Sequence, residues 1–110
     1  MATDGKLKVE DIKEGKGEEV HSGDTISIHY HGALENGKVF DSSVERGTPF
    51  KCRIGVGMVI DGWDMGVIGM KVGGKRKLTI PPALAYGDRA IGDIPAGSTL
   101  IFDVELVSID

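Results

Sequence analysis

The three histidines of this sequence are candidates for metal binding. His29 and His31 stand two residues apart in a segment of alternating polarity, so they face the same side of a predicted strand, with His21 upstream. Imidazoles in such a pair can bind a metal weakly, but no cysteine or supporting acid pattern accompanies them. No metal site is therefore predicted.

The carboxylates do not form a recognisable catalytic pair. Asp41, Asp61 and Asp64 are the candidates, yet nothing in the sequence holds two of them at the separation that a glycosidase requires. The sequence also lacks a GxSxG nucleophile elbow, a P-loop, and a G-x-G-x-x-G turn between a strand and a helix. The residue types therefore give no indication of nucleophilic, phosphoryl or dinucleotide chemistry.

A set of aromatic and aliphatic side chains spread along the chain indicates binding instead. Each of them alone is more often a core residue, but Asp41 follows Phe40 directly at the end of a predicted strand, and Tyr86 and Ile94 stand in a loop. An apolar cup with one acid and phenolic hydroxyls at its rim is how a site for a small apolar ligand is built. The set comprises Tyr30, Phe40, Phe50, Val59, Ile60, Trp63, Tyr86, Ile94 and Phe102.

The only tryptophan lies in the segment VIDGWDMG, residues 59–66. Trp63, Val67 and Met70 recur at i, i+4 and i+7, a spacing that predicts a helix over residues 60–70. Glycines within this range weaken its helix propensity, so tertiary packing must hold the segment helical. We expect Trp63 to lie at the start of this helix, with Gly62 leaving room for the indole.

The elements that would position these side chains are mostly strands. The residues at positions 36 and 37, Asn and Gly, predict a type I′ hairpin turn, with the returning strand beginning at Val39. Residues 13–23 are charged and contain glycine, so they are predicted as a loop. Residues 41–49 are polar and broken by glycine and proline, so they are predicted as a bulge or loop. Further strands are predicted over residues 7–12, 24–31, 50–54, 75–80 and 100–109.

The longest irregular segment, residues 81–99, reads PPALAYGDRAIGDIPAGST. Long ordered loops in small domains are usually functional, and this one carries an aromatic and an apolar residue that a plain connector does not need. Mostly antiparallel strands and one short helix predict an α+β fold, in which a twisted sheet wraps over the helix. No internal repeat is present.

Length and composition fit one small domain. The chain has 110 residues, of which 40% are hydrophobic and 27% charged, and 17 are glycines without a fixed period. The net charge of −4 does not favour a nonspecific grip on nucleic-acid phosphates. We therefore predict a single domain over residues 1–110, without nucleic-acid partners and monomeric by default.

The sequence also predicts a compartment. Cys52 is the sole cysteine, so no intramolecular disulfide can form. The N-terminal stretch MATDGKLKVEDIKEG lacks the apolar run of a secretory signal, and no segment approaches the roughly 18 apolar residues of a membrane span. The expectation is a cytoplasmic protein, away from membranes, with nuclear access by diffusion.

Five separated motifs resemble one known family. They are VFDSS at 39–43, RGTPF at 46–50, GVGMVIDGWDMG at 55–66, KLTIPPALAYG at 77–87 and STLIFDVEL at 98–106. In this order they are similar to the tacrolimus-binding immunophilins, the FKBP-type peptidyl-prolyl cis-trans isomerases in their minimal single-domain form, from about residue 7 to residue 109. The resemblance implies a five- to six-stranded antiparallel sheet around one short helix, with an apolar pocket between them.

The resemblance also implies roles for individual residues. Trp63 would form the pocket floor, Ile94 would belong to an overhanging loop, and Arg46, the Ile60 N–H and the Tyr86 hydroxyl would supply polar contacts. The implied catalytic residues are Tyr30, Phe40, Asp41, Tyr86 and Phe102. The implied substrate-binding residues are Arg46, Phe50, Val59, Ile60, Trp63 and Ile94.

The implied activity is acceleration of rotation about X-Pro bonds, by binding the twisted amide in a water-poor pocket without a metal or cofactor. The implied ligands are proline-containing peptides and the macrolides tacrolimus and rapamycin. An alternative is a binding module in which the same pocket holds a partner segment and catalysis is incidental. A third hypothesis, a sheet that grips proline-rich ligands on its surface, makes Trp63 merely a core residue.

Two places depart from the family pattern. The loop after Tyr86 is about one residue shorter, with Ala96 in place of a proline, so substrate preference and macrolide affinity are expected to differ there. Asp61 stands before Gly-Trp, where Lys, Arg or Pro is usual, and its charge is expected to alter partner choice at the pocket rim.

Overall fold

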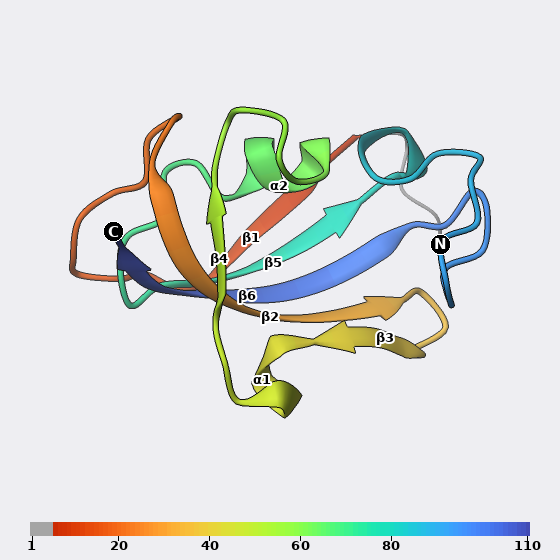
Figure 1. Ribbon diagram of the computed structural model, residues 1–110, viewed down its shortest axis with the longest axis horizontal. Coiled ribbons are helices and arrows are strands. Elements are labelled where there is room, and N and C mark those ends of the chain that lie inside the picture. The colour runs from red at the N-terminus through yellow and green to blue at the C-terminus, as the bar shows by residue number, and fades with distance from the viewer. Residues whose placement is uncertain (1–5) are drawn as a thin grey trace.

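One antiparallel sheet organises the chain. The computed structural model describes residues 6–110, and in this range six strands form a sheet in the order β1-β5-β6-β2-β3, with β4 also paired to β2 (Figure 1). The α+β fold with a sheet curled over a short helix is confirmed. The strands are β1 (Lys8–Lys13), β2 (Thr25–Leu34), β3 (Val39–Ser42), β4 (Phe50–Arg53), β5 (Lys75–Ile80) and β6 (Leu100–Ile109), and the helices are α1 (Ser43–Arg46), α2 (Asp61–Gly66) and the 3-10 turn η1 (Pro82–Leu84).

β2 joins strands β1, β5 and β6 on one side of the sheet to β3 and β4 on the other. One edge of β2 pairs with β6 along nearly its whole length, while the other edge pairs first with β4, at residues 25–28, and then with β3, at residues 31–33. Its side chains alternate as predicted, with Ile26, Ile28 and Tyr30 buried toward α2. Residues of both β3 and β4 can therefore reach the space beside Tyr30.

α2 lies directly on β5 because two of its residues have no side chain. A Cβ at Gly62 would lie 2.5 Å from Ile80 Cγ2, and one at Gly66 would lie 2.9 Å from Leu78 Cδ2. The spacing i, i+4 places both glycines on the helix face that meets the sheet. The prediction that Gly62 makes room for the indole is therefore wrong, since its space is filled by Ile80.

The helix itself is shorter than predicted. It covers residues 61–66 rather than 60–70, and the chain turns at Gly69, where φ is +87°. The apolar stripe nevertheless points inward, because Trp63, Val67 and Met70 are all buried. The periodicity identified the buried face correctly, while the glycines ended the helix after two turns.

The hairpin between β2 and β3 differs in type from the prediction. Gly37 N donates to Leu34 O at 2.9 Å and Leu34 N donates to Lys38 O at 2.9 Å, which leaves three residues in the loop. Gly37 has φ +90°, but no non-glycine residue in the described range has a positive φ. A type I′ turn needs positive φ at both Asn36 and Gly37, so this is the longer loop in which only the glycine is left-handed.

The loop predicted over residues 41–49 contains a short helix. Ser42 caps α1 with its side chain, since Glu45 N donates to Ser42 Oγ at 3.3 Å, and Gly47 ends the helix. Ser42 and Glu45 have the S-x-x-E spacing of a capping box, a signal present in the sequence that the prediction missed. α1 fills the gap between β3 and β4 along the edge of β2 (Figure 1).

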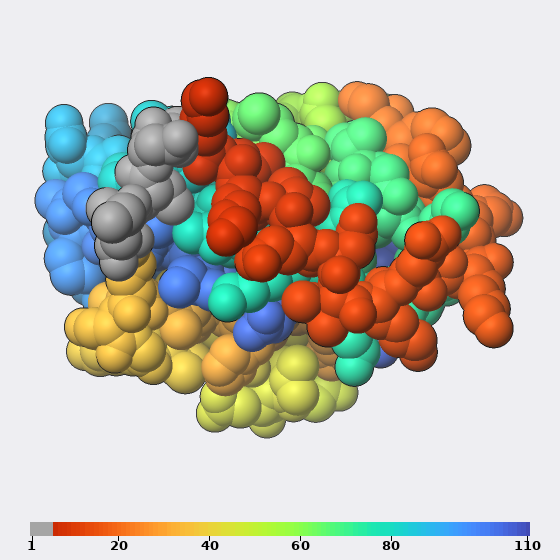
Figure 2. All heavy atoms as spheres, turned by 180° about the vertical axis from the view of Figure 1, so that it is seen from behind, coloured from red at the N-terminus to blue at the C-terminus, as the bar shows by residue number. Residues whose placement is uncertain are grey.

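The N-terminal segment lies on the face of the molecule seen in Figure 2, where β1 is an edge strand of the sheet. β1 pairs with β5 and lies one residue later than predicted, and in the following loop Val20 is buried and donates its N–H to Met70 O at 2.8 Å. The first five residues of the stretch expected to lack a secretory signal fall outside the described range. Within residues 6–110, no helix has the length and apolar character needed to cross a membrane.

Replacing Gly62 by alanine tests how tightly α2 must lie on β5. The new methyl group would overlap Ile80, and overpacking of this kind costs about 1–3 kcal/mol of unfolding free energy. Urea denaturation measures the loss. Met65→Ala, at an exposed position of the same helix, is the control and should change the free energy by less than about 0.5 kcal/mol. An equally small effect of Gly62→Ala would contradict this account of the packing.

Candidate functional site

An apolar cavity of about 420 Å³ lies between α2 and the inner face of the sheet. All of the predicted site residues except Arg46 and Ile94 line it, although they come from segments between β2 and β6. Gly57 and Met58 also line it and were not predicted as site residues, although they stand in the motif directly before Val59. The lining residues are Tyr30, Phe40, Asp41, Phe50, Gly57, Met58, Val59, Ile60, Trp63, Tyr86 and Phe102.

Trp63 is the centre of the aromatic wall. Its ring centroid lies 5.2 Å from Tyr30 and 5.3 Å from Phe102, and both pairs meet edge to face. Only 4% of Trp63 is exposed, and its Nε1 is buried without a hydrogen-bond partner in the described part of the chain. Because the rings fix one another at near-perpendicular angles, the wall is rigid and its surface is mainly ring faces and edges.

Three side chains that hydrogen-bond one another form the polar side of the cavity. Tyr30 OH donates to Asp41 Oδ2 at 2.6 Å, and Arg46 Nη2 donates to Tyr30 OH at 2.9 Å. Arg46 Nη1 also donates to Asp41 Oδ1, forming an ion pair. Arg46 does not line the cavity, but α1 carries it to the two residues that do. The Tyr30 proton is thus already donated to Asp41, which leaves the hydroxyl only a lone pair for a ligand.

The same contacts set the protonation of the group. Burial works against ionisation of Asp41, but the hydrogen bonds from Tyr30 and Arg46 outweigh it and hold the pKa of Asp41 below its ordinary value. Burial, together with the bond to Asp41, raises the pKa of Tyr30 above its ordinary value. At neutral pH the cavity therefore holds a carboxylate and a neutral phenol.

Asp64 on α2 shapes the turn that carries Met58, Val59 and Ile60. Gly55 N donates to Asp64 Oδ1 at 2.8 Å, and Gly57 N donates to Asp64 Oδ2 at 3.0 Å. The carboxylate therefore ties the turn to the helix that holds Trp63. The Met58 side chain is 64% exposed, so it forms an outer edge of the cavity.

The loop of residues 81–99 contributes one of its two predicted site residues. Tyr86 lines the cavity, following η1. Ile94 does not line it: the residue is 6% exposed, belongs to the hydrophobic core, and forms an isolated bridge with Ile91. An apolar residue in a glycine-rich segment can point into the core or over a pocket, and the sequence alone did not distinguish these orientations.

Other reactive side chains of the described range lie away from the cavity. His29 and His31 face the opposite side of β2, where their Nδ1 atoms lie 3.0 Å and 3.3 Å from hydroxyls of Ser43 and Ser42. Cys52 is buried, and desolvation raises its pKa to about 11, so the thiol stays protonated. No three His, Cys, Asp or Glu side chains of residues 6–110 are grouped to hold a metal.

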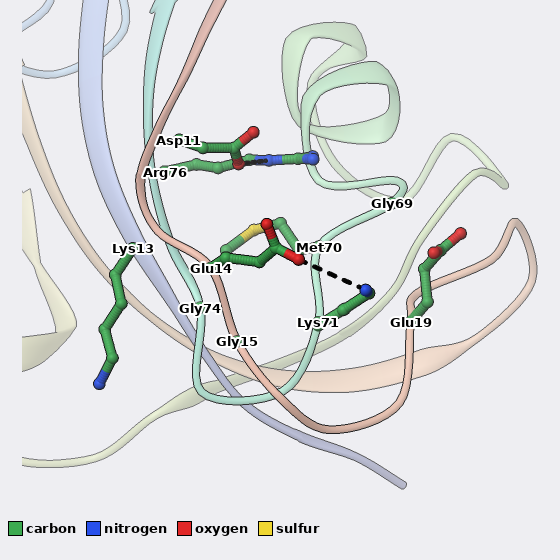
Figure 3. Close-up of a pocket in the computed structure, with 10 residues that line it drawn as sticks. All are labelled: Asp11, Lys13, Glu14, Gly15, Glu19, Gly69, Met70, Lys71, Gly74 and Arg76. Atoms are coloured by element: carbon green, nitrogen blue, oxygen red, sulfur yellow. Dashed lines mark hydrogen bonds and ion pairs between the residues drawn. The ribbon is translucent and has the colours of Figure 1, made fainter.

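A second, polar cavity of about 250 Å³ lies between β1, β5 and residues 69–71 (Figure 3). Four of its charged side chains form two pairs, since Arg76 Nε donates to Asp11 at 2.6 Å and Lys71 lies 3.5 Å from Glu14. Arg76 Nη1 also donates to the carbonyls of Gly66 and Ile68, at the end of α2. The side chains of this cavity therefore fasten the helix to β1 and β5.

A sheet curled over a two-turn helix, with one aromatic cavity and a charged group at its rim, defines a domain that binds an apolar ligand rather than attacking it. The model of the FKBP-type peptidyl-prolyl cis-trans isomerases matches residues 16–107. FK506-binding protein 1 of Saccharomyces cerevisiae is 52% identical over 109 residues, covering 97% of this chain and 96% of its own length. The chain belongs to this family.

Longer relatives and solved structures agree with this assignment. FK506-binding protein 4 of Chaetomium thermophilum is 56% identical over 103 residues, 94% of this chain, but the chain spans only 21% of that relative's length. The crystal structure of AtFKBP13 superposes with a TM-score of 0.88 at 48% identity, covering 99% of this chain and 97% of that one. FkpA from Escherichia coli superposes with a TM-score of 0.88 at 43% identity, with this chain covering 51% of it.

Replacing Asp64 by alanine tests the link between α2 and the turn before Val59. Two backbone N–H groups lose a charged acceptor, and hydrogen bonds to charged groups are each worth about 1.5–3 kcal/mol. Amide hydrogen exchange at Gly55 and Gly57 should accelerate at least about tenfold. Asp61→Ala, at an exposed position of the same helix, should leave these two rates unchanged. Unaltered exchange in Asp64→Ala would refute the link.

The stability contributed by Asp41 should depend on pH. A carboxylate whose pKa is lowered in the folded protein stabilises it at pH values above the ordinary pKa of 3.8, and this contribution disappears as pH falls through the lowered value. The difference in denaturation midpoint between the parent and Asp41→Asn should be constant from pH 5 to 7 and should shrink below about pH 4. Asp93→Asn, at an exposed loop position, serves as the control. A difference that widens toward acid pH would exclude the assigned direction.

Proposed function

We propose that this chain accelerates cis-trans rotation of X-Pro peptide bonds by holding the proline against Trp63. The observation that carries the proposal is the cavity itself, in which an apolar aromatic wall faces one ionised, fully bonded carboxylate. Membership of the isomerase family supports the same reaction. A pyrrolidine ring is small, compact and apolar, so it can pack against the surface presented by these rings.

The proposed mechanism needs no proton transfer. Rotation about an X-Pro bond meets a barrier of roughly 18–20 kcal/mol that arises from amide resonance. A twisted amide has lost this resonance and has less charge separation than a planar one, so it is easier to desolvate. An apolar, water-poor cavity therefore binds the twisted state more tightly than the planar ground state, which lowers the barrier.

Polar groups around the cavity would fix one side of the bond while the other side turns. The Tyr86 hydroxyl and the Ile60 N–H are the proposed donors to substrate carbonyls. Asp41 would act electrostatically, since it already accepts hydrogen bonds from Tyr30 and Arg46. Arg46 is a positioning residue in this scheme, because it acts through these two side chains. The remaining wall contacts are assigned to Phe40, Phe50, Val59 and Phe102.

Binding of tacrolimus and rapamycin is part of the proposal. The names of the relatives describe FK506-binding proteins, at 52% identity in Saccharomyces cerevisiae and 64% in Dictyostelium discoideum. The second candidate function is a binding module that holds a proline-containing partner segment in the same cavity without depending on catalysis. It is favoured by the exposed apolar edge at Met58 and Phe50, which extends the cavity outward.

Other expectations from the sequence stay predictions. They are a single domain over residues 1–110, a monomeric state, a cytoplasmic location with nuclear access, and no nucleic-acid or membrane partner. The expected role of Ile94 in substrate binding is proposed only in an indirect form, because its side chain packs in the core. It would support the loop that carries Tyr86.

The isomerisation rate of a short Leu-Pro peptide tests the proposed function. The protein should accelerate cis-trans exchange, and Phe40→Ala should lower kcat/KM by at least about tenfold through loss of an aromatic wall, a cost of about 1.4 kcal/mol in transition-state binding. Val107→Ala, at an exposed position of β6, should leave the rate unchanged. No acceleration by the parent protein would refute the enzyme.

Trp63 fluorescence distinguishes the binding module from the enzyme. Quenching or a shift of Trp63 fluorescence on addition of rapamycin, without any rate acceleration, would leave binding as the function of the cavity. No rate acceleration, together with no change of Trp63 fluorescence with rapamycin or with saturating peptide, would refute both functions. The tryptophan is the only one in the chain, so the signal reports on the cavity alone.

A further inference from the structure

The pairing of β2 with β3 contains one extra residue. His31 pairs with Ser42 and Gly32 pairs with Asp41, but Ala33 pairs with Val39. Phe40 is therefore left without a direct partner, and the strand bulges at this position. The bulge lies at the cavity, where Gly32 is also the partner of Phe102 on β6.

This bulge explains why Phe40 and Asp41 both line the cavity. Consecutive residues of a regular strand point to opposite faces of the sheet, so one of the two would face away. Asp41 follows the regular pattern, since it pairs with Gly32 on the buried face of β2. Phe40 is the residue that the bulge turns toward the same side, and it meets Phe102 edge to face at 5.5 Å between ring centroids.

The Phe40 ring occupies the space of a missing side chain. A Cβ at Gly32 would lie 2.7 Å from Phe40 Cζ, 2.9 Å from Phe40 Cε1 and 2.7 Å from Phe102 Cε1. Such approaches are too short for real atoms, so any side chain at residue 32 would move both rings. Gly32 is not in a left-handed conformation, so steric space at the two rings, rather than backbone strain, is what requires glycine here.

We propose that Gly32 is a positioning residue for the isomerase site, with the Phe40 bulge as the feature that it accommodates. The inference rests on the proposed function, because the two rings that Gly32 seats are proposed walls of the proline site. Asp41 is coupled to the same feature, since it pairs with Gly32 in the sheet. A methyl group at residue 32 displaces the walls while leaving every cavity side chain present.

Gly17 supplies a matched control. A Cβ at Gly17 would lie 2.6 Å from Val72 Cβ, an overlap like that at Gly32, but neither residue lines the cavity. Gly17 also has no positive φ. Gly17→Ala and Gly32→Ala therefore introduce the same methyl group under similar crowding, in one case away from the aromatic walls and in the other between them.

The experiment measures kcat/KM per folded molecule for both variants, with the folded fraction taken from urea denaturation. Displacement of a substrate-positioning group by about 1 Å can cost about 100-fold in rate, so Gly32→Ala should lose 10- to 100-fold. Gly17→Ala should retain the parent value. Equal kcat/KM per folded molecule in Gly32→Ala and the parent would overturn the proposal.

A double-mutant cycle adds a readout that general destabilisation does not change. Phe40→Leu removes the two ring atoms nearest the Gly32 methyl, so it should cost less activity in the Gly32→Ala background than in the parent. The same substitution combined with Gly17→Ala should be additive. Additivity in both backgrounds would overturn the proposal. If Gly32→Ala alone does not fold, the Gly32→Ala/Phe40→Leu protein must regain folding, with an activity no higher than that of Phe40→Leu because the overlap with Phe102 remains. Failure to regain folding counts against the proposal.

Spectroscopy separates this inference from the proposed function. The near-ultraviolet circular dichroism and Trp63 emission of the aromatic cluster should change in Gly32→Ala and stay at the parent values in Gly17→Ala. If the parent protein shows no isomerase activity, the proposed function fails, and the spectra still decide whether Gly32 positions the rings. If the parent is active and the spectra of the two variants are both unchanged, the inference fails alone.

Discussion

The close approach of α2 to β5 is the constraint on which the rest of the structure depends. With hydrogen atoms in place of side chains at Gly62 and Gly66, the helix settles onto Ile80 and Leu78, and Trp63 is held at the level of the rings that rise from β2 and β6. Arg76 binds the carbonyls at the end of the helix, and Asp64 ties the adjoining turn to its side. A helix of six residues has little stability of its own, so these contacts define it.

The cavity that results is built for selection by shape and polarity. Its strongest polar group is satisfied internally, because Tyr30, Asp41 and Arg46 bond one another before any ligand arrives. A ligand therefore meets an organised field that does not need to rearrange, which is the condition for electrostatic preorganisation. The reactive side chains of the described range are elsewhere, so the surface offers contact and desolvation rather than bond chemistry.

The sequence predicted the parts of the fold that follow from local pattern. β5 and β6 have the predicted bounds, and the stripe of Trp63, Val67 and Met70 is buried. α1 was not predicted, although its capping residues have the S-x-x-E spacing in the sequence. The bulge at Phe40 could not be predicted, because strand register depends on pairing between distant segments. The pattern of aromatic and aliphatic residues singled out most of the site, and the family resemblance added Arg46 and the individual roles. Ile94, which packs in the core, shows that sequence alone does not reveal which way a loop side chain points.

The position of β6 in the sheet has a consequence for how the molecule is made. This strand is the last one in the described chain, yet it lies between β5 and β2, and it supplies Phe102 to the cavity. During synthesis on the ribosome β2 and β5 emerge before β6. The strand that pairs with both of them is therefore missing until residues 100–109 appear. The sheet must therefore form largely after translation of these residues, through contacts of high sequence separation, which fold slowly. Rotation about X-Pro bonds, which this protein is proposed to accelerate, can limit the folding of other chains. The topology of this protein thus slows its own folding by a different step.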